Sequence, residues 1–190
     1  MKKSFLFPLI MVMASLMIPG TSAFGQKFHH KRGPLKETEN IYTVPALDGK
    51  KTIVQAKSLF SGFIDPKFVK WGLDQPGPET PETEVQEYEV IASASVWEMF
   101  SCFDLGMVCL TQDQIMNYCQ ANRSDFKKLW QTKLFLTEKD FNLPAEKKNL
   151  FVIGVYAGPN GFGALLFKPN DKQVWRQKGL NSIIIRKIGQ

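Results

Sequence analysis

Histidine is almost absent from this chain, and its scarcity excludes the commonest catalytic arrangements. The only two histidines, His29 and His30, are adjacent and lie in a polar, basic stretch near the N-terminus. A Ser-His-Asp or Cys-His site needs an imidazole as its general base, so such a site would have to recruit this stretch into the body of the fold. We therefore expect no nucleophilic catalysis that depends on histidine.

Metal-binding and phosphate-binding motifs are missing as well. The spacing Cys102-x6-Cys109-x9-Cys119 matches no zinc ribbon or zinc finger. The glycine-rich segment 158–163 lies between two apolar runs rather than before a helix, which favours a turn over a phosphate-binding loop. A thiol-redox role lacks a Cys-x-x-Cys pair. The sequence thus predicts no metal and no cofactor.

Beyond residue 23 no apolar run is long enough to span a membrane. The N-terminus itself has the pattern of a secretory signal peptide: the basic head Met1–Lys3, an apolar segment at 4–18, and small residues at Thr21 and Ala23. We expect cleavage after Ala23, with a site after Gly25 as second choice and an uncleaved N-terminal anchor as the alternative. No cysteine lies directly after the apolar segment, which argues against a lipidated N-terminus. The pattern predicts a bacterial protein exported to the periplasm or the extracellular space, which meets the membrane only through this signal.

The charge balance and the proline-rich segment suggest the domain organisation. The formal net charge of +6 is a mild excess that does not argue for nucleic-acid binding. Residues 24–40 are polar and basic without a period, so we expect a disordered or loosely docked basic arm. Residues 41–190 then form one domain, in which the proline-rich segment 75–83 is a long surface loop rather than a linker between two domains.

The C-terminal part of the chain predicts an antiparallel sheet. Short β-branched and aromatic runs alternate there with Gly, Pro and Asn. The runs are 151–157, 163–167, 173–176 and 182–188, which we interpret as a meander of about four strands that is entered from a strand at 133–137. In the first two runs neither face is polar, which indicates inner strands covered on both sides.

Two helices with capping boxes are expected to pack against this sheet, which makes the fold class α+β. Ser95 with Glu98 and Thr111 with Gln114 have the Ser/Thr-x-x-Glu/Gln spacing that pairs two otherwise unpaired amides. Ser93 is an alternative N-cap for the first helix. Near residue 122 the second helix either bends or gives way to a second short helix that starts at Ser124.

The remaining upstream segments give weaker signals. The runs 41–44 and 52–56 flank a turn and suggest an edge hairpin. Residues 67–72 suggest another short strand, and 84–91 predict a strand with many polar side chains, towards an edge of the sheet.

The three cysteines admit more than one pairing. In an exported protein we favour a disulfide between Cys102 and Cys109, because the turn between them could bring the two Cβ atoms within bonding distance. A bond between Cys109 and Cys119 is the second choice. Three buried thiols remain the alternative.

Carboxylates and tryptophans are the remaining candidates for chemistry. Acid–base catalysis without histidine needs paired carboxylates, and the candidates nearest apolar surroundings are Asp65, Glu98, Asp104 and Asp113. Each has a structural explanation as a turn former, helix cap, helix exit or first-turn residue. Most of the tryptophans fit core packing. Trp175, followed by Arg176 in a run of mixed polarity, is the binding candidate.

These observations favour a non-enzymatic, exported domain that binds another envelope or secreted protein. Its role could be that of an accessory subunit of an envelope assembly or an immunity-type inhibitor of a toxin. The alternative function is a histidine-free hydrolase that cleaves envelope glycans with carboxylates.

Overall fold

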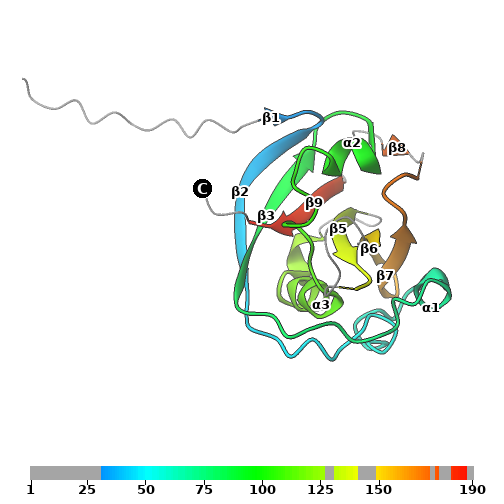
Figure 1. Cartoon of the computed structure of the whole chain (residues 1–190). Helices are drawn as coiled ribbons and strands as arrows, with labels where there is room; N and C mark the ends of the chain where they lie inside the picture. Colours follow the sequence, from blue (N-terminus) through cyan, green and yellow to red (C-terminus); the bar gives the residue numbers. More distant parts are fainter. Residues whose placement is uncertain (1–30, 127–130, 141–148, 172–173, 176–180, 188–190) are drawn as a thin grey trace, which may run out of the picture.

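A sheet of seven strands in the order β1-β2-β3-β9-β5-β6-β7 forms the centre of the computed structural model (Figure 1). The structure describes residues 31–126, 131–140, 149–171, 174–175 and 181–187, so the predicted signal peptide at 1–23 lies outside the described residues. The strands of this sheet are β1 (Lys31–Arg32), β2 (Leu35–Val44), β3 (Thr83–Val90), β5 (Thr132–Glu138), β6 (Leu150–Gly158), β7 (Gly161–Phe167) and β9 (Asn181–Arg186). β5 and β9 are parallel, and the other neighbouring strands pair antiparallel. The fold is thus a mixture of helix and a mostly antiparallel sheet.

Short helices and a second, two-stranded sheet complete the described fold. The small sheet pairs β4 (Ala94–Ser95) with β8 (Val174–Trp175). The helical elements are α1 (Lys67–Lys70), α2 (Val96–Phe100), α3 (Gln112–Ala121) and the 3-10 turn η1 (Arg123–Asp125). In the part of the chain that the structure describes, no helix is both long and apolar enough to cross a membrane.

The predicted C-terminal meander is wrong in its second half. β5, β6 and β7 do follow one another antiparallel, and Gly161, with φ +117, allows the tight turn between β6 and β7. β8, however, leaves this sheet to pair with β4, and β9 inserts between β3 and β5. β9 suits the middle of the sheet because Ile183 and Ile185 are buried on one of its faces and Ile184 on the other.

Each face of the large sheet has its own apolar core. We call them the α3 face and the α2 face, after the helix that packs on each. Along β5, Phe135 belongs to the core of the α3 face, whereas Leu134 and Leu136 belong to that of the α2 face. β6 alternates in the same way, with Ile153 on the α3 face and Val152 on the α2 face. The prediction that the runs 151–157 and 163–167 are covered on both sides is confirmed, but only β6 is an inner strand, because β7 is the last strand of the sheet.

Both helices begin at the residues expected from their spacing. The Ser95 hydroxyl accepts a hydrogen bond from the Glu98 amide, and the Glu98 carboxylate accepts one from the Ser95 amide. Thr111 and Gln114 make the same reciprocal pair in front of α3. Such pairs satisfy amides that have no partner inside the helix. α3 ends at Ala121 and is followed by η1.

The first turn of α3 also holds the long loops on its face of the sheet. The side chain of Gln112 donates to the Leu73 carbonyl at 2.7 Å and accepts from the Ile53 amide at 3.1 Å. The proline-rich segment is fixed to the preceding loop at Gly49, whose φ is +71 and whose carbonyl accepts from Gly77. A Cβ at Gly49 would lie 2.1 Å from the Pro78 carbonyl oxygen, so only glycine allows the two loops to approach so closely.

Several predictions for the N-terminal half are corrected. Residues 35–40 belong to β2 rather than to a loose arm, because Leu35 is buried in the core of the α2 face. Residues 52–56 form turns, so β2 pairs with β3 and not with a hairpin partner. Residues 67–70 form α1 instead of a strand. β3 lies between β2 and β9 rather than at an edge, since its polar side chains find buried partners.

The predicted disulfide between Cys102 and Cys109 is not formed. Each sulfur instead donates to a carbonyl oxygen four residues before it, Cys102 to Glu98 at 3.4 Å and Cys109 to Leu105 at 3.1 Å. The second-choice bond of Cys109 to Cys119 is absent too. Cys119 lies in the core of the α3 face, whereas Cys109 lies in the core of the α2 face, so the sheet separates these two thiols.

Candidate functional site

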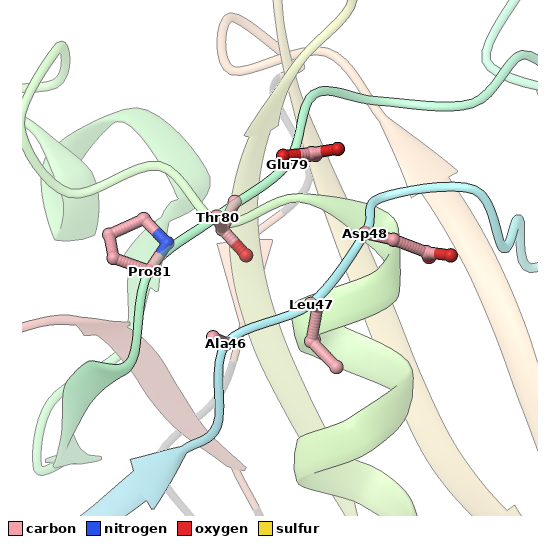
Figure 2. Close-up of a pocket in the computed structure, with 6 residues that line it drawn as sticks. All are labelled: Ala46, Leu47, Asp48, Glu79, Thr80 and Pro81. Atoms are coloured by element: carbon pink, nitrogen blue, oxygen red, sulfur yellow. The ribbon is translucent and has the colours of Figure 1, made fainter.

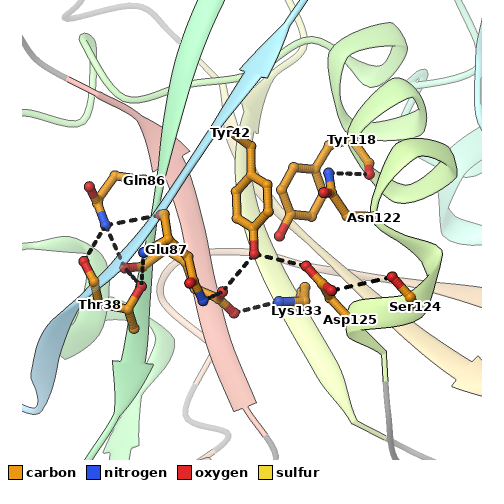
Figure 3. Close-up of polar contacts among 10 residues, drawn as sticks. Thr38, Tyr42, Gln86, Glu87, Tyr118, Asn122, Ser124, Asp125 and Lys133 are labelled. Carbon is orange, nitrogen blue, oxygen red and sulfur yellow. Dashed lines mark hydrogen bonds and ion pairs between the residues drawn. The ribbon is translucent and has the colours of Figure 1, made fainter.

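A polar cavity of about 300 Å³ opens on the α3 face, where β2, β3, β5 and η1 come together (Figure 3). Its lining is polar throughout, which contrasts with the apolar core beside it. The lining residues are Asn40, Tyr42, Glu87, Asp125, Gln131 and Lys133. We call it the polar cavity.

A buried ion pair between Glu87 and Lys133 forms the floor of the polar cavity. Glu87 comes from β3 and Lys133 from β5, so the two side chains meet across β9, which lies between these strands. Their side chains are only 9% and 2% exposed. The Lys133 ammonium also lies 5.9 Å from the ring centre of Tyr118 and 5.5 Å from that of Phe126, so aromatic faces share in its desolvation.

The second carboxylate oxygen of Glu87 faces the opening of the cavity. It accepts a hydrogen bond from the side-chain amide of Asn40 at 2.9 Å. The Tyr42 hydroxyl lies 3.4 Å from this oxygen and 2.8 Å from the Asp125 carboxylate. A hydroxyl has one proton to donate, so the shorter contact, to Asp125, is the stronger hydrogen bond.

The local backbone explains why these side chains converge. The register of β2 against β3 shifts between Glu37 and Ile41, which is the signature of a β-bulge. The bulge is fixed by Gln86, whose side-chain amide donates to the carbonyls of Thr38 at 2.8 Å and Asn40 at 3.1 Å. A bulge redirects the side chains next to it, and here the Asn40 side chain reaches Glu87.

Tyr118 of α3 forms the inner wall of the cavity together with Tyr42. Their rings meet edge to face, with centres 5.1 Å apart. Tyr118 is 1% exposed, and its hydroxyl has no hydrogen-bond partner among the residues that the structure describes. Figure 3 shows this hydroxyl pointing toward the Tyr42 hydroxyl and Lys133.

The protonation states of the cavity are fixed away from neutral pH. Burial alone would raise the pKa of Glu87, but the charge and hydrogen bond of Lys133, together with the Asn40 amide, hold the pKa below its usual value. Burial raises the pKa of Tyr42, and the hydrogen bond to Asp125 and the charge of Glu87 raise it further. Burial and the Glu87 charge likewise raise the pKa of Tyr118. Glu87 is therefore charged and both phenols are neutral at physiological pH.

The four carboxylates that the sequence singled out do not line the polar cavity. Three of them accept hydrogen bonds from nearby backbone amides, as turn and cap residues do. They are Asp65 with the Lys67 amide (2.9 Å), Glu98 with the Ser95 amide (2.7 Å) and Asp104 with the Gly106 amide (3.1 Å). The structure thus does not bring them together as an acid–base pair.

Asp113, the fourth carboxylate, is a buried first-turn residue of α3. It is 3% exposed, and one of its carboxylate oxygens has no partner among the described residues. Burial raises the pKa of Asp113 and the charge of Asp48 adds to the rise, while Lys51 opposes it. Asp113 lies apart from the polar cavity.

Trp175, the predicted binding residue, lies on the opposite side of the sheet. It is part of β8, and its ring meets Phe167 edge to face with centres 5.6 Å apart, within the core of the α2 face. Arg176 lies outside the described residues. The binding role of this pair stays a prediction.

A second, surface cavity of about 560 Å³ is less suited to recognition (Figure 2). Its wall is the backbone ladder in which the amides and carbonyls of Leu47 and Thr80 bond each other at 2.9 Å. Of its two carboxylates, Asp48 and Glu79, Asp48 has a side chain 53% exposed and pairs with Lys50 at 3.4 Å. Exposed charges of this kind are screened by water and contribute little to binding.

The residues of the polar cavity were missed at the sequence level, although one signal was present. Glu87 and Lys133 both occupy positions whose strand neighbours on the same face, Val85 and Phe135, are buried in the core of the α3 face. Opposite charges at inward positions of two strands indicate a buried ion pair, because an unpaired charge there would be too costly.

Comparison of the chain with protein-family models, with curated proteins and with solved structures finds no match.

Proposed function

We propose that this chain is an exported, non-enzymatic domain that binds another exported protein through the polar cavity. The export part of the proposal rests on the signal-peptide pattern of residues 1–23. The binding part rests on the charges and hydrogen bonds inside the cavity.

One set of contacts carries the binding proposal: the cavity joins a buried ion pair, Glu87 with Lys133, to the hydrogen bonds of Asn40 and Tyr42, and its shifted groups titrate away from neutral pH. The pKa of Glu87 is lowered, whereas those of Tyr42 and Tyr118 are raised. A general acid or base works best when its pKa lies near the working pH. Groups whose protonation does not change present a constant set of donors and acceptors instead, and recognition needs such a set.

The size and place of the cavity favour a protein partner. A volume of about 300 Å³ is at the lower end for small-molecule pockets, so it suits the end of one side chain rather than a whole metabolite. The cavity is also lined by two residues of β2, whose outer side pairs, among the described residues, only at Leu35 and Lys36 with β1. A polypeptide can therefore approach along this edge of the sheet.

The test is crosslinking and affinity capture from the envelope fraction of the exporting cell, read by mass spectrometry. Asp125→Asn keeps the shape of a half-buried lining residue and removes its charge, and we expect it to lose the captured protein. Asp48→Asn, the same change in the surface cavity, is the matched control and should retain that protein. Identical capture by both variants would reject the polar cavity as the binding site. The same sample shows whether the mature N-terminus is the predicted one.

One observation favours the alternative function, a hydrolase of envelope glycans. Glu87 and Asp125 both contact the Tyr42 hydroxyl, so two carboxylates face one cavity, as glycoside cleavage requires. The mechanism also needs a carboxylic acid with a raised pKa, and Glu87 has a lowered one. Turnover of peptidoglycan that disappears in a folded Asp125→Asn variant would replace the binding proposal with this one.

A further inference from the structure

The charges of the polar cavity do not balance. Its described lining contains two carboxylates, Glu87 and Asp125, and one ammonium, that of Lys133. Lys133 is already paired with Glu87, and its side chain is almost completely buried, so it has little capacity for a further anion. Asp125 therefore remains as a negative charge without a cation among the lining residues.

Two acceptors of the cavity have unused capacity. One oxygen of Asp125 accepts from Tyr42, while its other oxygen has only a long contact of 3.4 Å from the Ser124 hydroxyl. The side-chain amide of Asn40 donates one hydrogen bond to Glu87, and its carbonyl oxygen can accept from a ligand. A carboxylate oxygen and the amide oxygen of Asn40 suit a ligand that donates hydrogen bonds.

The buried hydroxyl of Tyr118 is an independent sign of a ligand. A buried hydroxyl without a partner costs free energy, and native structures leave few such groups unexplained. Tyr118 is 1% exposed, its hydroxyl lies beside that of Tyr42 without a well-aligned hydrogen bond to any described residue, and it points into the space between Tyr42 and Lys133 (Figure 3). A donor that enters the cavity past Asp125 would approach this hydroxyl.

We propose that the polar cavity takes a cationic nitrogen group, the guanidinium or ammonium end of a basic side chain of the protein partner. This inference rests on the proposed function and names the chemistry that its site selects. The cation neutralises Asp125, donates to the acceptors at the opening, and lies beside the Tyr42 ring, whose face attracts positive charge. An anion would meet Asp125 and, among the described lining residues, would find no unpaired cation.

The test measures binding of small probes to the purified protein by calorimetry and by amide chemical shifts. The cationic probes are N-acetyl-arginine amide and N-acetyl-lysine amide. The neutral probe is the citrulline analogue of the former, which keeps its shape, and N-acetyl-glutamate amide is the anionic one. We expect at least one cationic probe to bind about tenfold or more tightly than the citrulline analogue, because a charged hydrogen bond at a desolvated site is lost.

Matched variants locate the effect. Asp125→Asn should weaken the cationic probe about tenfold, whereas Asp48→Asn in the surface cavity should leave its affinity unchanged. Circular dichroism of both variants checks folding, and the comparison of probes on the unmodified protein needs no variant at all. Spermidine is a further arm: if it binds more tightly than both blocked amino acids, the source of the cation is a free polyamine rather than a side chain.

Three outcomes would overturn the inference. These are equal binding of the arginine and citrulline probes, preference for the anionic probe, and chemical shifts that map outside the polar cavity. The proposed function is judged separately. If Asp125→Asn loses the captured partner but no cationic probe binds, the proposed function stands and this inference is rejected. If cationic probes bind in the polar cavity but Asp125→Asn still captures the partner, this inference stands and the proposed function is rejected.

Discussion

The two faces of the large sheet solve the same packing problem with different chemistry. The core of the α2 face consists of buried apolar and aromatic side chains, covered by α2 and the small β4–β8 sheet. The core of the α3 face is equally apolar around Phe135 and Ile153, but it borders on Glu87 and Lys133. A buried ion pair is a weak source of stability, because desolvation offsets most of the attraction. Both apolar cores therefore stabilise the fold, and among the described residues the α3 face differs in having a buried ion pair beside its core.

β5 shows this contrast within adjacent residues. Lys133 points to the α3 face and Leu134 to the α2 face, and neither residue is more than 1% exposed. Changes at these two positions therefore report on the two faces under the same backbone.

The largest effect is expected for Lys133→Met. This change leaves the Glu87 carboxylate buried without its cation, and removal of one partner of a buried pair costs about 3–5 kcal/mol. Urea denaturation followed by circular dichroism measures the loss. Adding Glu87→Leu in the same chain should recover most of the loss, because two apolar side chains no longer bury a charge. A double variant as unstable as the single one would show that the pair itself is not the cause.

A cost of about 2–5 kcal/mol is expected for Leu134→Ala on the α2 face. The change removes apolar contacts and leaves a void, because Leu134 is fully buried in the core of the α2 face. The same denaturation experiment measures it, and Val174→Ala, at a side chain 57% exposed, is the control with an effect below about 0.5 kcal/mol. Unlike the loss caused by Lys133→Met, the loss caused by Leu134→Ala should not be restored when Glu87→Leu removes the charge of Glu87. Rescue by Glu87→Leu would contradict the separation of the two faces.

The helix caps give a smaller comparison between the faces. Thr111→Ala removes the cap of α3 and should cost about 1–2 kcal/mol, since Thr111 is 1% exposed and its amide partners are buried. Ser95→Ala removes the cap of α2 at an exposed site, where water replaces the hydroxyl, and should cost about 0.5–1 kcal/mol. Denaturant midpoints of the two variants give the order. An equal or reversed order would mean that burial does not set the value of these caps.

The smallest effect is a pH dependence that belongs to the α3 face alone. The folded pKa of Glu87 is lowered from 4.5, so its contribution to stability is fully present above about pH 4.5 and is lost as the pH falls through the folded pKa. The effect is small because burial opposes the influence of Lys133 on the same group. Glu87→Gln should reduce the loss of stability between about pH 7 and pH 3, as measured by urea midpoints. Glu84→Gln, at an exposed position of the same strand, is the control and should leave that loss unchanged.

Local signals in the sequence predicted the local elements of the fold. The β-branched runs around Val152 and Leu165 predicted β6 and β7 with both faces covered, and the spacing of Thr111 and Gln114 predicted where α3 begins. Such signals depend on residues a few positions apart, so the local structure that they predict does not depend on how distant segments pair. They do not contain the pairing of β9 with β3 and β5, because that pairing depends on contacts between distant segments.

The candidate site was less predictable for the same reason. Asn40 and Tyr42 belong to a stretch whose charged neighbours resemble a loose arm or an edge, and only the bulge against β3 brings Asn40 to Glu87. Asp125 contributes through η1, a single turn that no strong pattern announces. The carboxylates chosen from the sequence, such as Asp65, were those with apolar neighbours along the chain, whereas the site is built from neighbours in space.

The position of β9 determines when this fold can be completed. β9 joins the unit β1-β2-β3 to the unit β5-β6-β7, and it follows all the other strands of the large sheet in the sequence. Until it has emerged, the two units have no shared ladder, and Glu87 and Lys133 have no strand to hold them at the spacing at which they pair. The core therefore remains incomplete until β9, the last strand of the large sheet to be made, is present.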